Sequence, residues 1–330
     1  MKRKIGLVIQ GALVSVGRTG DKLHQTPEEL KRQGGVIEYD TRDNINRIIR
    51  EYGHLFDEIV VSVFDNQLRP GEFFPGAKIV SAPDPGGIKQ IGHYKDNNKA
   101  RQFQSTLNGL IELEKSGIEY AVKTRTDTYL PFDKLLESFF ESDTKKIGST
   151  VVHPPNYLIH DLYFVAELGA LKKFCEAILA YDGFEFISSV HRDIILKPAH
   201  VLYKKEISAP EWAYFPNFPP DGVSKETRRV FNYMSDNAFF SLSPEIWRET
   251  LWRGTYFAPD HFVNLLGSKD GKQRNYNLPA LITTDWERYF QFKKELFGYK
   301  ITLLDRVRII LGRWGWSLWN LARKVVRYFL

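Results

Sequence analysis

Residues 120–127 read Tyr120-Ala121-Val122-Lys123-Thr124-Arg125-Thr126-Asp127, and this segment sets the expected fold class. Its first half is apolar, as in a buried strand, and polar groups crowd its carboxyl end before Pro131. In open α/β sheets, ligands bind outside the carboxyl ends of the strands. Arg125 and Asp127 are two residues apart, so their side chains share one face of an extended backbone. A guanidinium beside a carboxylate suits a phosphate held together with a divalent cation; the alternative is an ordinary ion pair at a strand end.

Strand-like and helix-like segments alternate in the first half of the chain. We predict strands over residues 5–9, 58–64 and 77–81, a helix that begins near Thr41 or Asp43, and a helix over residues 97–115. This alternation with short connections predicts an α/β fold, in which helices cover both faces of a mostly parallel sheet. The polar, Gly-rich segment 13–36 follows the first strand, and it is either an insertion beside a ligand or a plain surface loop.

The second half of the chain has a mixed pattern. We predict strands over residues 146–152 and 160–165, a helix over residues 167–180, and an irregular aromatic segment over residues 212–220. Ser243-Pro244-Glu245 predicts a further helix start, because Ser is a good cap and Pro fits the first turn.

Composition places the chain among globular proteins, with 43% hydrophobic and 26% charged residues. Cys175 is the single cysteine, so no intramolecular disulfide is possible and a reducing cytosol is favoured. Its apolar surroundings indicate a buried bystander rather than a nucleophile. The sequence lacks an apolar run of about 18 residues, and therefore a spanning helix. It also lacks a phosphate-binding P-loop, a G-x-G-x-x-G fingerprint and a G-x-S-x-G elbow, which argues against dehydrogenases and hydrolases.

Further polar groups are expected near the carboxyl ends of the strands. Asp65 follows a predicted strand and projects from the same sheet edge as Asp127, where a nucleotide would need an acceptor; the alternative is a helix cap or turn residue. Asn98 and Arg101 begin the helix before the segment at 120–127, and such a helix start favours anion binding. Simple capping beside a solvated arginine is the alternative for this pair.

Four motifs occur in a fixed order along the chain: Gly6-Leu7-Val8-Ile9-Gln10-Gly11, Tyr39-Asp40-Thr41-Arg42-Asp43-Asn44-Ile45, Ile59-Val60-Val61-Ser62-Val63-Phe64-Asp65 and Lys123-Thr124-Arg125-Thr126-Asp127. In order and spacing this set resembles the WavE family of lipopolysaccharide-synthesis proteins, which are regarded as glycosyltransferases. The resemblance covers about residues 5–165 well and the remainder loosely. Family members often have Pro after the Gln-Gly pair, whereas this chain has Ala12 and then a long insertion.

The resemblance implies a GT-A-like nucleotide-sugar transferase with a Rossmann-type, mostly parallel sheet. Such enzymes hold a metal on the donor pyrophosphate with an Asp-x-Asp motif at a strand end. Arg125-Thr126-Asp127 occupies that place here, so Asp127 is the expected ligand of Mg²⁺ or Mn²⁺, or else Arg125 partly replaces the metal. The residues expected to bind the donor are Gln10, Asp65, Asn98, Arg101, Arg125 and Asp127. We expect Asp127→Ala to abolish transfer and to leave the fold intact.

The expected domain spans residues 1–300, with a nucleotide-sugar-binding half over 1–145 and an acceptor half over 146–300. Transfer with inversion needs a base that takes the proton of the acceptor hydroxyl. The candidates for this base lie in the second half and are Asp161, Asp236 and Glu245. Asp236 has an alternative role as the cap of a helix over residues 238–240, and Glu245 as an ordinary acid of a first helical turn.

Residues 301–330 form a predicted basic amphipathic helix. The segment Leu303 to Leu330 carries six basic residues against one acid, with apolar residues three or four apart and three tryptophans. This pattern is typical of an interfacial membrane helix; docking on the protein's own core is the alternative. The rest of the chain is close to neutral, which argues against nucleic-acid binding.

Together these features predict a cytoplasmic glycosyltransferase that is peripherally bound to the inner membrane. It would move a sugar from a nucleotide-sugar donor to a lipid-linked or cell-surface glycan, in lipopolysaccharide, O-antigen or capsule synthesis. The alternatives are another nucleotide-dependent transferase and a non-catalytic membrane-associated scaffold. The sequence leaves open the sugar, the nucleotide, the acceptor linkage and the stereochemical outcome.

Overall fold

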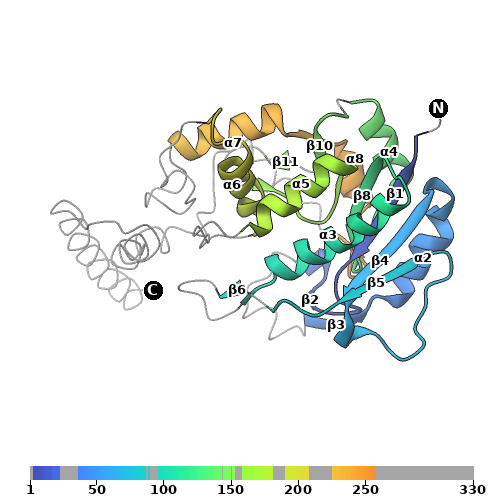
Figure 1. The fold of residues 1–330 in the computed structure, drawn as a ribbon. Coiled ribbons are helices and arrows are strands. Elements are labelled where there is room, and N and C mark those ends of the chain that lie inside the picture. Colours follow the sequence, from blue (N-terminus) through green and yellow to red (C-terminus); the bar gives the residue numbers. More distant parts are fainter. Residues whose placement is uncertain are drawn as a thin grey trace, which may run out of the picture.

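The structure is a computed structural model, and it describes residues 3–22, 36–86, 88–89, 96–142, 144–149, 151–152, 158–180, 190–207 and 225–257 (Figure 1). The predicted irregular segment 212–220 and the predicted basic helix 301–330 lie outside these residues. None of the helices in the described part combines the length and the apolarity that crossing a bilayer takes.

Seven strands form the central sheet, in the order β14-β10-β13-β8-β1-β4-β5. They are β1 (Ile5–Gln10), β4 (Glu58–Phe64), β5 (Lys78–Ala82), β8 (Tyr120–Arg125), β10 (Ile147–Ser149), β13 (Phe164–Glu167) and β14 (Phe239–Ser241). The neighbouring pairs are parallel except those of β13, which runs antiparallel to both β8 and β10. The predicted α/β fold with a mostly parallel sheet is confirmed.

The helices lie on both faces of this sheet. They are α2 (Arg42–Tyr52), α3 (Lys99–Lys115), α4 (Phe132–Phe140), α5 (Leu168–Leu179), α6 (Val190–Leu202), α7 (Lys225–Asn237) and α8 (Pro244–Glu249). The helices predicted from Thr41 or Asp43, over 97–115, over 167–180 and at Ser243 are confirmed to within a few residues. As predicted, Ser243 caps α8, because its Oγ accepts a hydrogen bond from the Glu245 N–H at 3.3 Å.

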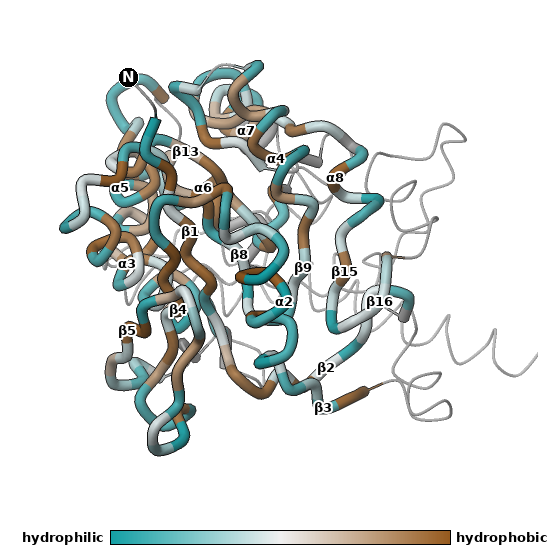
Figure 2. Tube along the Cα trace, turned by 90° about the vertical axis from the view of Figure 1, so that its right-hand side faces the viewer, coloured by the Kyte–Doolittle hydropathy of each residue, from teal (hydrophilic) through white to brown (hydrophobic). Residues whose placement is uncertain are grey.

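Side chains point alternately to the two faces of the sheet along the central strands, and this divides the hydrophobic core into two clusters. In β1, Leu7 and Ile9 belong to the cluster that includes residues of α2, α4 and α8, whereas Val8 points to the opposite face and belongs to the cluster that includes residues of α3, α5, α6 and α7. Figure 2 shows the apolar strands β1 and β4 between α3 on one side and α2 on the other. The approach of α3 is close at Gly109, where an added Cβ would lie 2.5 Å from Cγ1 of Val8.

Smaller strand pairs surround the sheet. They are β2 (Val14–Arg18) with β3 (Val36–Asp40), β6 (Ile88–Lys89) with β7 (Asp96–Asn97), β11 (Val151–Val152) with β12 (Leu158–Ile159), and the three-stranded group β9 (Thr128–Tyr129), β15 (Leu251–Trp252) and β16 (Thr255–Tyr256). Within the described ranges, the short 3-10 helices η1 (Gly20–Lys22), η2 (Gly53–Leu55) and η3 (Asp65–Gln67) follow β2, α2 and β4.

Two expectations need correction. The segment 13–36 is not a plain surface loop, because it contains β2, which pairs with β3 in an antiparallel register from Val14↔Asp40 to Arg18↔Val36. Most of β3, residues 37–40, lies beyond the segment, so local composition did not reveal the strand. Asp236 does not cap a helix over 238–240 either, because Asp236 lies in the last turn of α7 and β14 follows.

The strand order places one topological switch point between β1 and β8. The chain leaves β1 towards β4 on one side and later returns to pair β8 on the other side. Gln10 at the end of β1 lies opposite Arg125 at the end of β8. In open α/β sheets, ligands bind beside the carboxyl ends of the strands at such a point.

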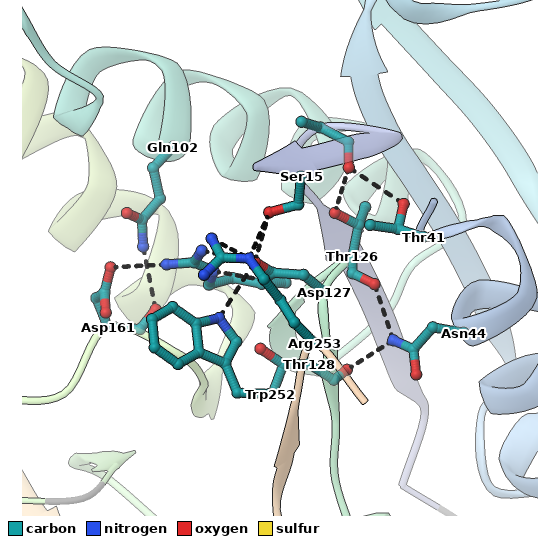
Figure 3. Close-up of polar contacts among 12 residues, drawn as sticks. Ser15, Thr41, Asn44, Gln102, Thr126, Asp127, Thr128, Asp161, Trp252 and Arg253 are labelled. Carbon is teal, nitrogen blue, oxygen red and sulfur yellow. Dashed lines mark hydrogen bonds and ion pairs between the residues drawn. The ribbon is translucent and has the colours of Figure 1, made fainter. Parts of the chain in front are cut away.

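The first turn of α2 holds the two loops that leave this edge (Figure 3). The hydroxyl of Thr41 donates to the carbonyl of Ala12 at 3.1 Å or of Leu13 at 3.2 Å. The amide Nδ2 of Asn44 donates to the carbonyls of Thr126 at 2.8 Å and of Thr128 at 3.2 Å. One helix start therefore fixes the loop after β1 and the loop after β8.

Replacing Asn44 by alanine should lower the free energy of unfolding by about 1–3 kcal/mol, because two buried carbonyls lose their donor. Urea denaturation measures the change. Asn108→Ala is the matched control, since Asn108 is half-buried on α3 and its side chain accepts only from Gln104 one turn away among the described contacts. Equal stability of the two variants would contradict the holding role of Asn44.

Candidate functional site

Arg125 and Asp127 form a side-by-side pair at the carboxyl end of β8. The Nε of Arg125 lies 2.9 Å from Oδ1 of Asp127, and its Nη2 lies 3.0 Å from Oδ2. The Asp127 side chain is 2% exposed and the Arg125 side chain 23%. The expected pairing of a guanidinium with a carboxylate is therefore present, and the Arg125 side chain is the more exposed of the two.

Three further groups donate to the same carboxylate (Figure 3). Oδ2 of Asp127 accepts from the Ser15 hydroxyl at 2.8 Å and from the indole Nε1 of Trp252 at 3.2 Å. Nη2 of Arg253 also lies 3.2 Å from this oxygen. Burial alone would raise the pKa of Asp127, but the charges of Arg125 and Arg253 outweigh burial and hold it below its usual value. Asp127 is thus an ionised, internally bound carboxylate.

A tight turn between β15 and β16 delivers Arg253 to this carboxylate. Arg253 has a φ of 48° and Gly254 a φ of 80°, the positive pair that two-residue hairpin turns require. The backbone N–H of Arg253 donates to the Asp127 carbonyl at 2.8 Å, and its Nε donates to Ser15 Oγ at 3.0 Å. Gly17 leaves room for the guanidinium, because an added Cβ there would lie 2.8 Å from Nη1 of Arg253.

Asp161 joins the group from the loop before β13. Its Oδ2 lies 3.5 Å from Nη1 of Arg125, and its side chain is 8% exposed. The main-chain carbonyl of Asp161 accepts from Nε2 of Gln102 on α3 at 3.0 Å and from Nζ of Lys123 on β8. Of the three predicted base candidates, Asp161 is the one that contacts Arg125.

The other two candidates lie elsewhere on the surface. Asp236 is exposed in the last turn of α7, just before β14. Because β14 runs in the same direction as β8, Asp236 lies at the amino ends of the strands, opposite the edge that carries Asp127. Glu245 is exposed in the first turn of α8, where it fits the ordinary first-turn acid. Their catalytic roles stay untested predictions.

The remaining predicted donor-binding residues lie at or near the same edge. Gln10 is buried at the end of β1, and Asp65 is exposed immediately after β4. Arg101 binds Asp84 through Nε at 2.7 Å and Asn98 through Nη1 at 3.1 Å. The anion site expected at this helix start therefore already contains a carboxylate. Nucleotide binding by these residues stays a prediction.

The donor set around Asp127 does not fit the predicted metal site. Both carboxylate oxygens accept from arginine, and Oδ2 also accepts from Ser15 and Trp252. A metal at Asp127 would have to displace these donors. Among the described residues, no group of three or more His, Cys, Asp or Glu side chains is placed to hold a metal ion. We therefore assign no step to a metal, and the role of Asp127 as a metal ligand stays an untested prediction.

Sequence reasoning missed Ser15, Gln102, Trp252 and Arg253 as members of the site, and it passed over Lys123. Ser15 and Trp252 lie 112 and 125 residues from Asp127, so no local pattern connects them. Lys123 did carry a signal, because a lysine inside an apolar strand must find a partner when it is buried.

Lys123 is a fully buried lysine on β8. Burial lowers its pKa to about 7, while Asp161 acts in the opposite direction and Arg125 adds to the lowering. The facing charged or titratable groups are Asp161, Arg125, Asp127 and Cys175. The thiol of Cys175 is itself buried, and burial raises its pKa to about 12, which supports the predicted bystander role.

The lowered pKa of Lys123 should make the free energy of unfolding depend on pH. Between pH 7 and the pKa of an unfolded lysine, about 10.4, the unfolded chain binds the extra proton, so this group makes stability rise with pH. Lys123→Met should remove that rise, and the exposed Lys173→Met on α5 should retain it. Urea denaturation at pH 7, 8 and 9 measures it; parallel curves for the wild type and Lys123→Met would contradict the low pKa.

The chain is similar to several solved structures, at low sequence identity. No protein-family model matches the chain, and no curated protein matches it. A putative nucleotide-diphospho-sugar transferase from Desulfovibrio desulfuricans G20 is 11% identical with a TM-score of 0.35, over 60% of this chain and 77% of that chain. A 4-diphosphocytidyl-2C-methyl-D-erythritol synthase from Anaerococcus prevotii DSM 20548 is 9% identical with a TM-score of 0.33, over 80% and 96%.

A third similar structure is a glycosyltransferase involved in the glycosylation of the major capsid of PBCV-1. It is 11% identical with a TM-score of 0.29, over 73% of this chain and 82% of that chain. Identities and scores at this level do not assign a family. The WavE resemblance therefore stays a prediction from the sequence.

Proposed function

We propose that the protein is a glycosyltransferase that uses a nucleotide-sugar donor. The observation that carries the proposal is the assembly of Arg125, Asp127 and Asp161 at the switch point between β1 and β8. This is the edge where nucleotide ligands bind in open α/β sheets. The motifs that resemble the WavE family converge on the same edge, since Thr41 and Asn44 hold the loops from which the site is built.

Each group has a role in this proposal. Arg125 binds the diphosphate of the donor, because a guanidinium matches phosphate oxygens with parallel N–H donors. Gln10 and Asp65, at the ends of the neighbouring strands, face the nucleoside. The acceptor oxygen attacks the anomeric carbon, the bond from that carbon to the diphosphate oxygen breaks, and the nucleoside diphosphate leaves. Asp161, whose Oδ2 lies 3.5 Å from Nη1 of Arg125, takes the proton of the acceptor hydroxyl.

The acceptor is proposed from the sequence of the carboxyl-terminal segment. The segment Leu303 to Leu330 has the basic, aromatic and apolar pattern of an interfacial helix. A protein held at an anionic membrane surface is suited to an acceptor that is itself anchored in lipid. We therefore propose a lipid-linked glycan as the acceptor and the inner membrane surface as the place of action.

A thermal-shift screen with UDP, GDP, dTDP and CMP tests the proposed donor class. A nucleotide at 100 times its dissociation constant should stabilise the protein by about 2.7 kcal/mol. We expect a shift with one of these nucleotides, followed by release of the same nucleotide from its sugar conjugate when the acceptor is added. Release of inorganic pyrophosphate from a nucleoside triphosphate and a sugar phosphate would instead identify a nucleotidyltransferase. No shift with any nucleotide would favour the non-catalytic scaffold.

Amide variants of the three candidate acids test which of them is the base. Asp161→Asn should lower kcat by about 10²–10⁴-fold and leave nucleotide binding in place, because the amide cannot accept the proton. The matched replacements Asp236→Asn and Glu245→Gln should retain the wild-type rate. Steady-state kinetics with isothermal titration of the nucleotide measures both effects. A slow Asp236 or Glu245 variant beside an active Asp161 variant would overturn the assignment.

A further inference from the structure

Arg125, Asp127, Asp161 and Arg253 are the four charged side chains that meet at the carboxyl end of β8, and Arg125 is the most exposed of them. The side chain of Arg125 is 23% exposed, whereas those of Asp161 and Arg253 are 8% exposed and that of Asp127 is 2% exposed. Both acids are thus more deeply buried than Arg125 is.

The guanidinium of Arg125 is fixed and still has donors to offer. It has five N–H groups, and its described contacts are the two bonds to Asp127 and one bond to Asp161. Its centre also lies 5.9 Å from the ring centroid of Trp252, on which Arg253 packs at 4.4 Å. An arginine held in this way loses little rotamer freedom when it binds an oxyanion.

Asp127 contributes to the site by orienting two arginines rather than by binding a metal ion. Its five donors come from Arg125, Ser15, Trp252 and Arg253, and each arginine is fixed from a second side, by Asp161 or by the carbonyl of Arg18. Displacing an arginine from Asp127 to admit a metal would leave a guanidinium without that partner. Such a change is costly, because a buried charge depends on its counterion.

We infer that the diphosphate of the donor binds directly to Arg125, with Arg253 as a second positive charge behind it, and that no divalent cation takes part. The inference rests on the proposed function and adds to it the way in which the leaving diphosphate is neutralised. Charge that develops on the leaving oxygen is stabilised by N–H donors that are already in place. The Arg125-Thr126-Asp127 sequence thereby does with arginine what the expected motif does with a metal.

Isothermal titration with inorganic pyrophosphate tests this without knowledge of the nucleoside. We expect binding in EDTA, with an affinity that Mg²⁺ or Mn²⁺ does not improve. Arg125→Met should weaken binding on the order of tenfold to a hundredfold, the loss of charge-assisted hydrogen bonds, and Arg125→Lys should lie between. Arg50→Gln is the matched control, because the Arg50 side chain is 71% exposed on α2. Wild-type affinity in Arg125→Met would overturn the inference.

Mn²⁺ binding measured by electron paramagnetic resonance on the wild-type protein is independent of any variant's folding. We expect no stoichiometric Mn²⁺ binding, alone or with pyrophosphate; stoichiometric binding would overturn the inference. The thermal-shift screen in EDTA separates this inference from the proposed function. A nucleotide shift that requires Mn²⁺ would refute the metal-free site and retain the transferase. Pyrophosphate binding in EDTA, without a thermal shift for any nucleotide, would support the metal-free site and refute the proposed transferase activity.

Discussion

The buried carboxylate of Asp127 is the constraint on which the rest of the site depends. A charge with so little exposure is tolerated only when opposite charges and hydrogen-bond donors surround it. Here the donors come from three places in the chain: β2 supplies Ser15, β8 supplies Arg125, and the β15–β16 hairpin supplies Trp252 and Arg253. Satisfying one carboxylate therefore gathers three separate segments at the switch point and fixes the guanidinium of Arg125.

At the same sheet edge, residues from the motifs that resemble the WavE family have structural roles. Thr41 begins α2 but does not cap it with its side chain, because its hydroxyl bonds to the loop after β1. Asn44, one turn later, bonds to the loop after β8. Gly11 completes this join, since its φ is 135° and an added Cβ would lie 2.8 Å from Oγ1 of Thr126. These residues hold the loops that carry the site.

Most strands of the central sheet and four of the described helices, α2, α3, α5 and α8, could be predicted from the sequence, whereas β14, α4, α6, α7 and most of the site could not. Apolar runs such as Ile59 to Phe64 end at polar residues, and that local pattern is enough to place a strand and its carboxyl end. The pairing of Arg125 with Asp127 is equally local. Arg253 reaches Asp127 only because β15 pairs with β9, a contact between distant segments that periodicity does not encode. The metal expectation came from an Asp-x-Asp analogy, and the actual donor set depends on those distant segments.

The unfolding free energy of Asp127→Asn, compared with Asp65→Asn, tests the central claim most directly. Asp65 is an exposed strand-end acid at the same sheet edge, so it is the matched control. If Asp127 is the internal partner of two arginines, its amide variant should lose about 3–5 kcal/mol of unfolding free energy. This replaces the expectation from the sequence that a substitution of Asp127 leaves the fold intact. Asp65→Asn should stay within about 0.5 kcal/mol of the wild type. Wild-type stability of Asp127→Asn, together with lost nucleotide binding, would contradict the account and make Asp127 a ligand-binding residue on an independent fold.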